Sequence, residues 1–87
     1  MNIQPYKKNA KKHPDKQLKA VAKSIKEFGW QQPIVVDEKG VIIVGHGRWM
    51  AYQKYKDEYI LPEPDIKVAK LTTKQANAYR LADNNLK

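Results

Sequence analysis

Four β-branched residues run directly into a glycine turn in the stretch Val41-Ile42-Ile43-Val44-Gly45-His46-Gly47-Arg48. The apolar run at 41–44 predicts a short buried strand, and a helix is expected to follow from Arg48 to about Tyr55. Two glycines at such a turn permit positive φ and let backbone N–H groups approach an anion. The helix N-terminus adds free N–H donors and a partial positive charge. The stretch therefore predicts a phosphate site.

Two side chains of this turn can add to that site. Arg48 offers a bidentate guanidinium fork to phosphate oxygens, and His46 can donate from either ring nitrogen. Taken alone, the same four residues 45–48 also fit a tight strand-to-helix turn that carries an exposed arginine. The surrounding sequence has to separate these two interpretations.

Upstream of the turn, the sequence predicts a helix that starts at His13-Pro14-Asp15 and runs to Phe28. His13 is interpreted as its N-cap rather than as a ligand, and proline suits the first helical position at Pro14. Gly29 ends the helix. Apolar residues recur between these ends at helical spacing, namely Leu18, Val21, Ala22, Ile25 and Phe28.

The remaining elements complete an α+β fold, a small mixed sheet of three to four strands with about three helices. Residues 33–37 and 41–44 should form a hairpin, with at most a short further strand near residues 2–4. A third strand is expected over 66–71. Thr72-x-x-Gln75 has the form of a capping box, which predicts a helix to about Asn84. We expect one domain over 1–87, with a basic segment at 1–12.

Composition excludes several classes of site and activity. The 87 residues contain no cysteine, which rules out a disulfide framework, a cysteine-based zinc site and a thiol nucleophile. The first residues lack the apolar region of a signal peptide, and no apolar run approaches the roughly 20 residues that span a bilayer. The sequence predicts a cytoplasmic protein with no membrane association.

The net charge of +8 is unevenly distributed, since residues 7–26 carry eight lysines and a single aspartate. Such a field attracts polyanions and predicts salt-dependent, non-specific binding to a DNA backbone. A lysine face that only keeps the domain in solution is the alternative. The residues predicted to meet the backbone are Lys7, Lys8, Lys11, Lys12, Lys16, Lys19 and Lys23.

Three segments resemble, in order, the sequence boxes of ParB N-terminal domains. They are Gly29-Trp30-Gln31-Gln32-Pro33-Ile34, the stretch 41–48, and Leu81-Ala82-Asp83-Asn84. Gly-His-Gly-Arg is most similar to ParB-like modules of phage proteins and of DNA-modification methyltransferases. It also resembles the Gly-Cys-His-Arg of sulfiredoxins, but the cysteine needed for sulfiredoxin activity is missing. The chain is thus identified as a member of the ParB/sulfiredoxin-like superfamily.

This resemblance implies a nucleoside triphosphate, CTP or ATP, bound with Mg²⁺. Phosphates would be held by Gly45, His46, Gly47 and Arg48, with Gln32 and Ser24 near the nucleotide and Trp30 placed to stack on a base. Asp83 and Asn84 would face the phosphates or the Mg²⁺ ion. An ordinary solvent-facing serine and a frayed, polar helix end are the alternatives for Ser24 and for 83–84.

The function implied is a nucleotide-binding module that acts with DNA in binding, partition or modification. One alternative is an enzyme at the same site, a nuclease, NTPase or kinase, with His46 and Asp83 as catalytic candidates. Another is an inactive targeting domain of a DNA methyltransferase. The resemblance also allows a homodimer, since such modules pair through the nucleotide, and a larger parent protein.

Overall fold

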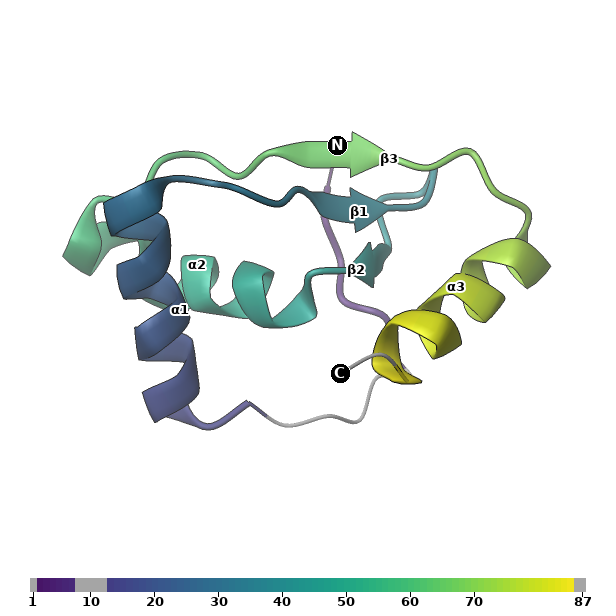
Figure 1. The fold of residues 1–87 in the computed structure, drawn as a ribbon. Helices are drawn as coiled ribbons and strands as arrows, with labels where there is room; N and C mark the ends of the chain where they lie inside the picture. The colour runs from purple at the N-terminus through teal and green to yellow at the C-terminus, as the bar shows by residue number, and fades with distance from the viewer. Residues whose placement is uncertain (1, 8–12, 86–87) are drawn as a thin grey trace.

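The computed structural model describes residues 2–7 and 13–85, and within them three helices and three strands make an α+β fold, as predicted (Figure 1). In chain order the elements are α1 (Asp15–Phe28), β1 (Ile34–Val36), β2 (Ile42–Val44), α2 (His46–Tyr59), β3 (Ile66–Val68) and α3 (Thr73–Asn85).

The sheet has the order β2-β1-β3 and is mixed. β1 and β2 form the predicted antiparallel hairpin, whereas β1 and β3 are parallel, with Val36 and Val68 as their last pair. β3 is three residues shorter than the expected strand 66–71, because its partner ends at Val36 and the chain then turns at Asp37. The strand expected near residues 2–4 forms a single bridge, from Gln4 to Val41.

The two faces of the sheet are covered by different helices. Ile34, Val36 and Ile42 are fully buried on one face, where Trp30 and Trp49 pack against them. Val35 and Ile43 pack on the other face against α3, which buries Ala76 there. Figure 1 shows α1 and α2 together at one end of the molecule and α3 at the other. A third apolar cluster fills the interface between α1 and α2, with Leu18, Ala22, Ile25, Ala51, Tyr55 and Leu61 as its buried members.

The start of α1 differs from the prediction. Pro14 is the N-cap residue, and no side chain caps this end. The Pro14 carbonyl accepts hydrogen bonds from the N–H groups of Gln17 (3.0 Å) and Leu18 (3.1 Å). The expectation that His13 is the N-cap is therefore wrong, because the proline ring already gives the backbone its helix-entering geometry. Gly29 ends the helix as predicted, with φ of 75° and its N–H on the Ile25 carbonyl.

The second helix is longer than the expected 48–55 at both ends. It begins at His46, directly after Gly45, and continues to Tyr59. The additional C-terminal turn is held by packing, since the rings of Tyr55 and Tyr59 stack at 5.4 Å. The Tyr55 hydroxyl also donates to the Asp15 carboxylate on α1. The second of these contacts joins residues on different elements, so the local sequence does not predict the additional turn.

α3 is joined to the hairpin by one buried arginine. Its start is the predicted capping box, in which the Thr72 N–H donates to Gln75 Oε1 (2.9 Å) and the Gln75 N–H to Thr72 Oγ1 (3.1 Å). Arg80 is only 7% exposed, and its Nε donates to the Ile42 carbonyl at 3.0 Å. Its guanidinium also lies 3.6 Å from the Asp37 carboxylate. In the described part of the chain, no helix is both long and apolar enough to cross a membrane.

Candidate functional site

Gly45 forms the junction between β2 and α2. Its φ of 102° is in the left-handed region, which favours glycine. A Cβ here would lie 3.3 Å from the Ile34 Cα and 3.1 Å from Arg48 Nη2. The missing side chain therefore permits the positive φ that the sequence predicts here, and it also allows the close approach of β1.

Gly47 has a different reason to be glycine. Its φ is outside the left-handed region and it lies in the first turn of α2, so only Gly45 of the two glycines uses the positive φ that glycine permits. A Cβ on Gly47 would lie 3.2 Å from Cε1 and 3.4 Å from Nδ1 of His13. The absent side chain makes room for the His13 imidazole.

Arg48 is half-buried between α1 and β1. Its Nη2 donates to the Pro33 carbonyl at 3.0 Å. Its Nε is buried and has no hydrogen-bond partner among the described residues. Burial lowers the pKa of the Arg48 guanidinium, and the negative charge of Asp83 opposes that shift. One buried N–H is thus left without an acceptor, which costs free energy unless a ligand supplies one.

His46 is oriented by the N-terminal segment. Its Nε2 accepts a hydrogen bond from the Tyr6 backbone N–H at 3.2 Å, so this nitrogen carries no proton in the structure. The expectation that either ring nitrogen of His46 donates to a phosphate is corrected for Nε2. The contact instead ties residues 2–7 to the first turn of α2.

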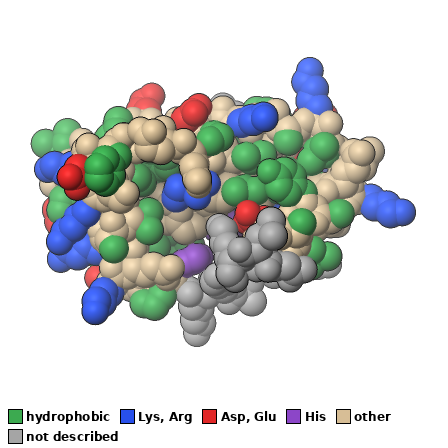
Figure 2. Space-filling model, in the orientation of Figure 1, with side chains coloured by type: hydrophobic (Ala, Val, Ile, Leu, Met, Phe, Trp, Pro, Cys, Tyr) green, Lys and Arg blue, Asp and Glu red, His purple; other side chains and the backbone are tan. Residues whose placement is uncertain are grey.

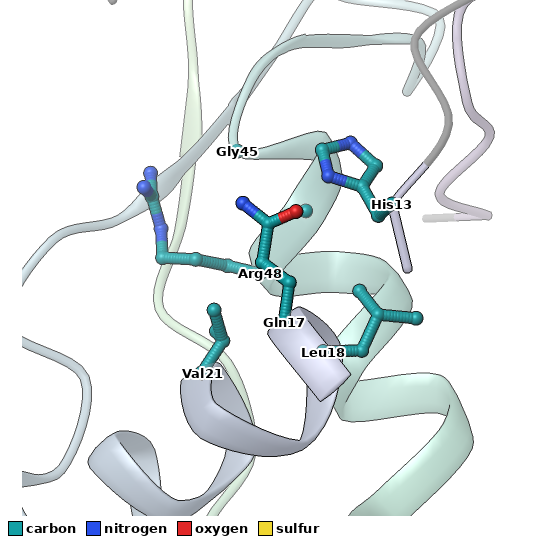
Figure 3. Close-up of a pocket in the computed structure, with 7 residues that line it drawn as sticks. His13, Gln17, Leu18, Val21, Gly45 and Arg48 are labelled. Atoms are coloured by element: carbon teal, nitrogen blue, oxygen red, sulfur yellow. The ribbon is translucent and has the colours of Figure 1, made fainter. Parts of the chain in front are cut away.

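Two adjacent pockets meet at Arg48. The smaller one, the His13 pocket, has a cavity volume of about 160 Å³ (Figure 3). The larger one, the Trp30 pocket, has a volume of about 390 Å³. Both are lined by Val21 and Arg48, and we call the pair the groove. The His13 pocket is completed by His13, Gln17, Leu18, Gly45 and Gly47, and the Trp30 pocket by Ser24, Ile25, Phe28, Gly29, Trp30, Gln31 and Gln32.

The groove gathers most of the residues that the sequence predicts for a nucleotide site. Gly45 and Gly47 line one pocket, Ser24 and Gln32 line the other, and Arg48 lines both. His13 and Gln17 are the residues that sequence reasoning missed. The available signal was Gly47 itself, since a glycine in a helical turn is unfavourable and points to a close neighbour.

A third hollow, of about 650 Å³, lies at the other end of the molecule between the N-terminal segment, the hairpin turn and α3. Its buried cation is Arg80, which bonds to the Ile42 carbonyl and to Asn77 Oδ1 (3.1 Å) and lies 4.1 Å from the centre of the Tyr6 ring. Because these contacts occupy the guanidinium, this larger hollow is a weaker candidate than the groove.

Comparison with known proteins identifies the family of the chain. Residues 1–85 match the ParB N-terminal domain family. The chain belongs to this family. It is 42% identical over 73 residues to the ParB-like nuclease domain-containing protein YnaK of Escherichia coli (strain K12), a match that covers 84% of this chain and 80% of that protein. The resemblance predicted from the three sequence boxes is confirmed.

In this ParB-family domain the charged face of α1 is separate from the groove. Lys16, Lys19, Lys23 and Lys26 are exposed and recur every three or four residues; we call them the lysine stripe. Successive helix residues are about 100° apart, so Lys16 and Lys23 point away from the neighbouring groove residues Gln17 and Ser24. Figure 2 shows lysine and arginine side chains at the end of the molecule where α1 lies.

The other residues predicted to meet DNA lie outside α1. Lys7 is exposed in the N-terminal segment. Lys8, Lys11 and Lys12 lie outside the described residues. The structure thus places four of the seven predicted lysines on the surface, three of them in the lysine stripe.

The acidic end of α3 lies near Arg48, since the charge of Asp83 acts on the guanidinium. The side chain of Asn84, the second predicted Mg²⁺ ligand, lies outside the described part of the chain. Over residues 2–7 and 13–83, no three His, Asp or Glu side chains form a group that could hold a metal ion. An ion at this site would have to take its other ligands from a bound anion or from water.

Proposed function

We propose that this ParB-family domain binds a nucleoside triphosphate in the groove and meets the DNA backbone through the lysine stripe. The observation that carries the nucleotide proposal is the buried Arg48 Nε, which lacks an acceptor at the point where the two pockets join. A phosphate oxygen is the acceptor that suits a guanidinium best.

The phosphate end of the proposed site is the N-terminus of α2. Gly45 brings the chain into the helix without a side chain in the way, and the first N–H groups of the helix have no intrahelical acceptor. The partial positive charge of this helix end adds to the charge of Arg48. Together they favour a ligand that carries several negative charges.

The base end of the proposed site is the Trp30 pocket. The indole Nε1 donates to the Pro62 carbonyl at 2.8 Å, and the ring packs edge-on against Tyr52 at 5.9 Å. The ring is therefore held in one orientation beside the cavity. Gln32 is exposed at the same pocket, and its amide offers both a donor and an acceptor to a base edge.

In this proposal Mg²⁺ binds together with the nucleotide phosphates. It commonly takes one or two carboxylates together with phosphate oxygens and water, and Asp83 is the carboxylate whose charge reaches Arg48. Asp83 would hold the ion, and the ion would offset phosphate charge. Loss of Mg²⁺ is expected to weaken nucleotide binding.

A second candidate is an enzyme at the same site, either an NTP-using enzyme or a nuclease. Two observations favour it: the Asp83 carboxylate acts on Arg48, and the relative from Escherichia coli is named for a nuclease domain. Turnover separates it from a binding module. Release of phosphate from nucleotide, or nicking of plasmid DNA, would have to disappear when Asp83 is replaced by Asn.

Titration with CTP, ATP and GTP, each with and without Mg²⁺, tests the nucleotide proposal directly. We expect saturable binding by the intact chain and a loss of about tenfold to a hundredfold in affinity for Arg48→Ala, the effect of removing a charge-assisted hydrogen bond. Lys74→Ala is the matched control, because it removes one positive charge from an exposed position outside both pockets.

Two results would contradict the proposal. One is the absence of saturable binding of all three nucleotides by the intact chain. The other is an Arg48→Ala affinity equal to that of Lys74→Ala, which would reduce the role of Arg48 to its bond with the Pro33 carbonyl.

A further inference from the structure

We infer that His13 recognises the terminal phosphate of the bound nucleotide and so makes the groove selective for triphosphates. This inference rests on the proposed nucleotide function and goes beyond it, because it names the side chain that distinguishes a triphosphate from a di- or monophosphate. It also gives a role to a residue that the sequence alone suggests is a helix cap.

The groove follows α1 along its length. Gln17, Val21 and Ser24 line it from successive turns of the same helix face. The rise of 1.5 Å per residue puts Gln17 and Ser24 about 10 Å apart along the axis. The Trp30 pocket lies toward the C-terminal end of α1 and the His13 pocket toward its N-terminal end, so an elongated ligand can occupy both at once.

The sizes and linings of the two pockets orient such a ligand. The Trp30 pocket is the larger, at about 390 Å³, and carries an aromatic ring and two glutamines. The His13 pocket, at about 160 Å³, is smaller and lies at the N-terminus of α2. A base fits the first and a phosphate the second. Since Arg48 lies between them, the phosphate chain passes over Arg48 and ends beside His13.

His13 is held in place on two sides. Its half-buried ring lies against Gly47, where a Cβ would come within 3.2 Å of the imidazole. Its backbone leads into Pro14, whose carbonyl accepts two hydrogen bonds from the first turn of α1. An imidazole fixed in this way loses little conformational entropy when it donates to a phosphate oxygen.

The charges around the start of α1 are compatible with an anion there. Asp15, the first residue of α1, is bound to Lys54 at 2.6 Å and to the Tyr55 hydroxyl. These contacts direct the carboxylate toward α2 and neutralise part of its charge. His13 and Gln17 thus present donors to the pocket without a carboxylate of α1 competing for them.

The test compares the tri-, di- and monophosphate of the nucleotide that binds most tightly, each with Mg²⁺. For His13→Ala we expect triphosphate affinity to fall about tenfold, the loss of one hydrogen bond to a charged group, while monophosphate affinity stays within about twofold. His13→Gln, which retains an N–H donor, should recover part of the loss. Gln53→Ala, at an exposed position of α2, is the control and should change neither affinity.

A second variant keeps the test informative if His13→Ala folds poorly. Gly47→Ala leaves His13 in the sequence but displaces its ring by a few tenths of an ångström or more, and alanine is the better helix former at that position. We expect the same selective loss of triphosphate affinity, and we expect the Tm of this variant not to be lower than that of the intact chain.

The outcomes separate this inference from the proposal beneath it. Binding by the intact chain with equal losses for tri- and monophosphate, or with no loss in either variant, overturns the inference and leaves the nucleotide site standing. No nucleotide binding by the intact chain overturns both. Selective loss of triphosphate affinity in both variants supports both.

Discussion

At the scale of single residues, Gly45 and Ile60 both have left-handed backbone conformations, with φ of 102° and 52°. At Gly45 the missing side chain avoids strain and lets β1 approach. Ile60 follows the last turn of α2, and its side chain is 84% exposed. A β-branched residue is strained in this conformation, and its exposed side chain gains little from packing.

Replacement of Ile60 by glycine should therefore stabilise the domain. We expect the free energy of unfolding to rise by about 0.5 to 1 kcal/mol, the relief of left-handed strain less the added freedom of the unfolded chain. Thermal unfolding by circular dichroism measures it as an increase in Tm of several degrees. Ile60→Val retains the β-branch and should show no increase; equal Tm values for both variants would contradict the strain at this position.

At the scale of elements, the sequence predicts well where the signal is local. An apolar stripe at helical spacing, with lysines on the opposite face, predicts α1. The capping box at Thr72 predicts the start of α3, and the run 41–44 before Gly45 predicts β2. These features depend on neighbours in the chain. The structure confirms each of them to within one residue.

Where long-range contacts determine the bounds of an element, the sequence predicts those bounds less accurately. The extra turn of α2 depends on Tyr55 meeting Asp15 on α1, and the end of β3 depends on where β1 stops. The candidate site divides in the same way. Its glycine turn and Arg48 follow from a local pattern, whereas His13 reaches Gly47 only after α1 and α2 have packed together.

The attachment of α3 depends mainly on Arg80, and this can be measured. In Arg80→Met the apolar part of the side chain is kept, but the Ile42 carbonyl and the Asp37 carboxylate lose their partner. We expect the free energy of unfolding to fall by about 2 to 4 kcal/mol in urea titrations. Lys74→Ala, an exposed change on the same helix, should have an effect below about 0.5 kcal/mol. A similarly small effect of Arg80→Met would show that packing at Ala76 holds α3.

At the scale of the whole molecule, the groove and the lysine stripe occupy different sides of α1. If the stripe meets DNA, the triple variant Lys16→Ala, Lys19→Ala and Lys23→Ala should weaken binding to duplex DNA. It should also reduce the slope of log affinity against log salt concentration by about 2 to 3, since each phosphate contact contributes roughly 0.9. Nucleotide affinity should stay within about twofold, and fluorescence anisotropy over a salt series measures both.

The matching control removes three exposed lysines outside α1, namely Lys67, Lys70 and Lys74. Net charge is then equal in the two variants. An equal reduction in slope for both variants would mean that DNA affinity depends on the overall charge of the protein and not on the exposed face of α1. A loss of nucleotide affinity in the α1 variant alone would mean that the two surfaces are not independent.

The parallel pairing of β1 with β3 also bears on how the chain reaches its native state. The hairpin joins residues close in sequence, whereas Ile34 pairs with Ile66 across a segment that includes all of α2. Closing so long a segment costs chain entropy before any contact is gained. We expect the hairpin and α2 to form early and β3 to add late. Refolding should accordingly be slower than that of a helical bundle of this length.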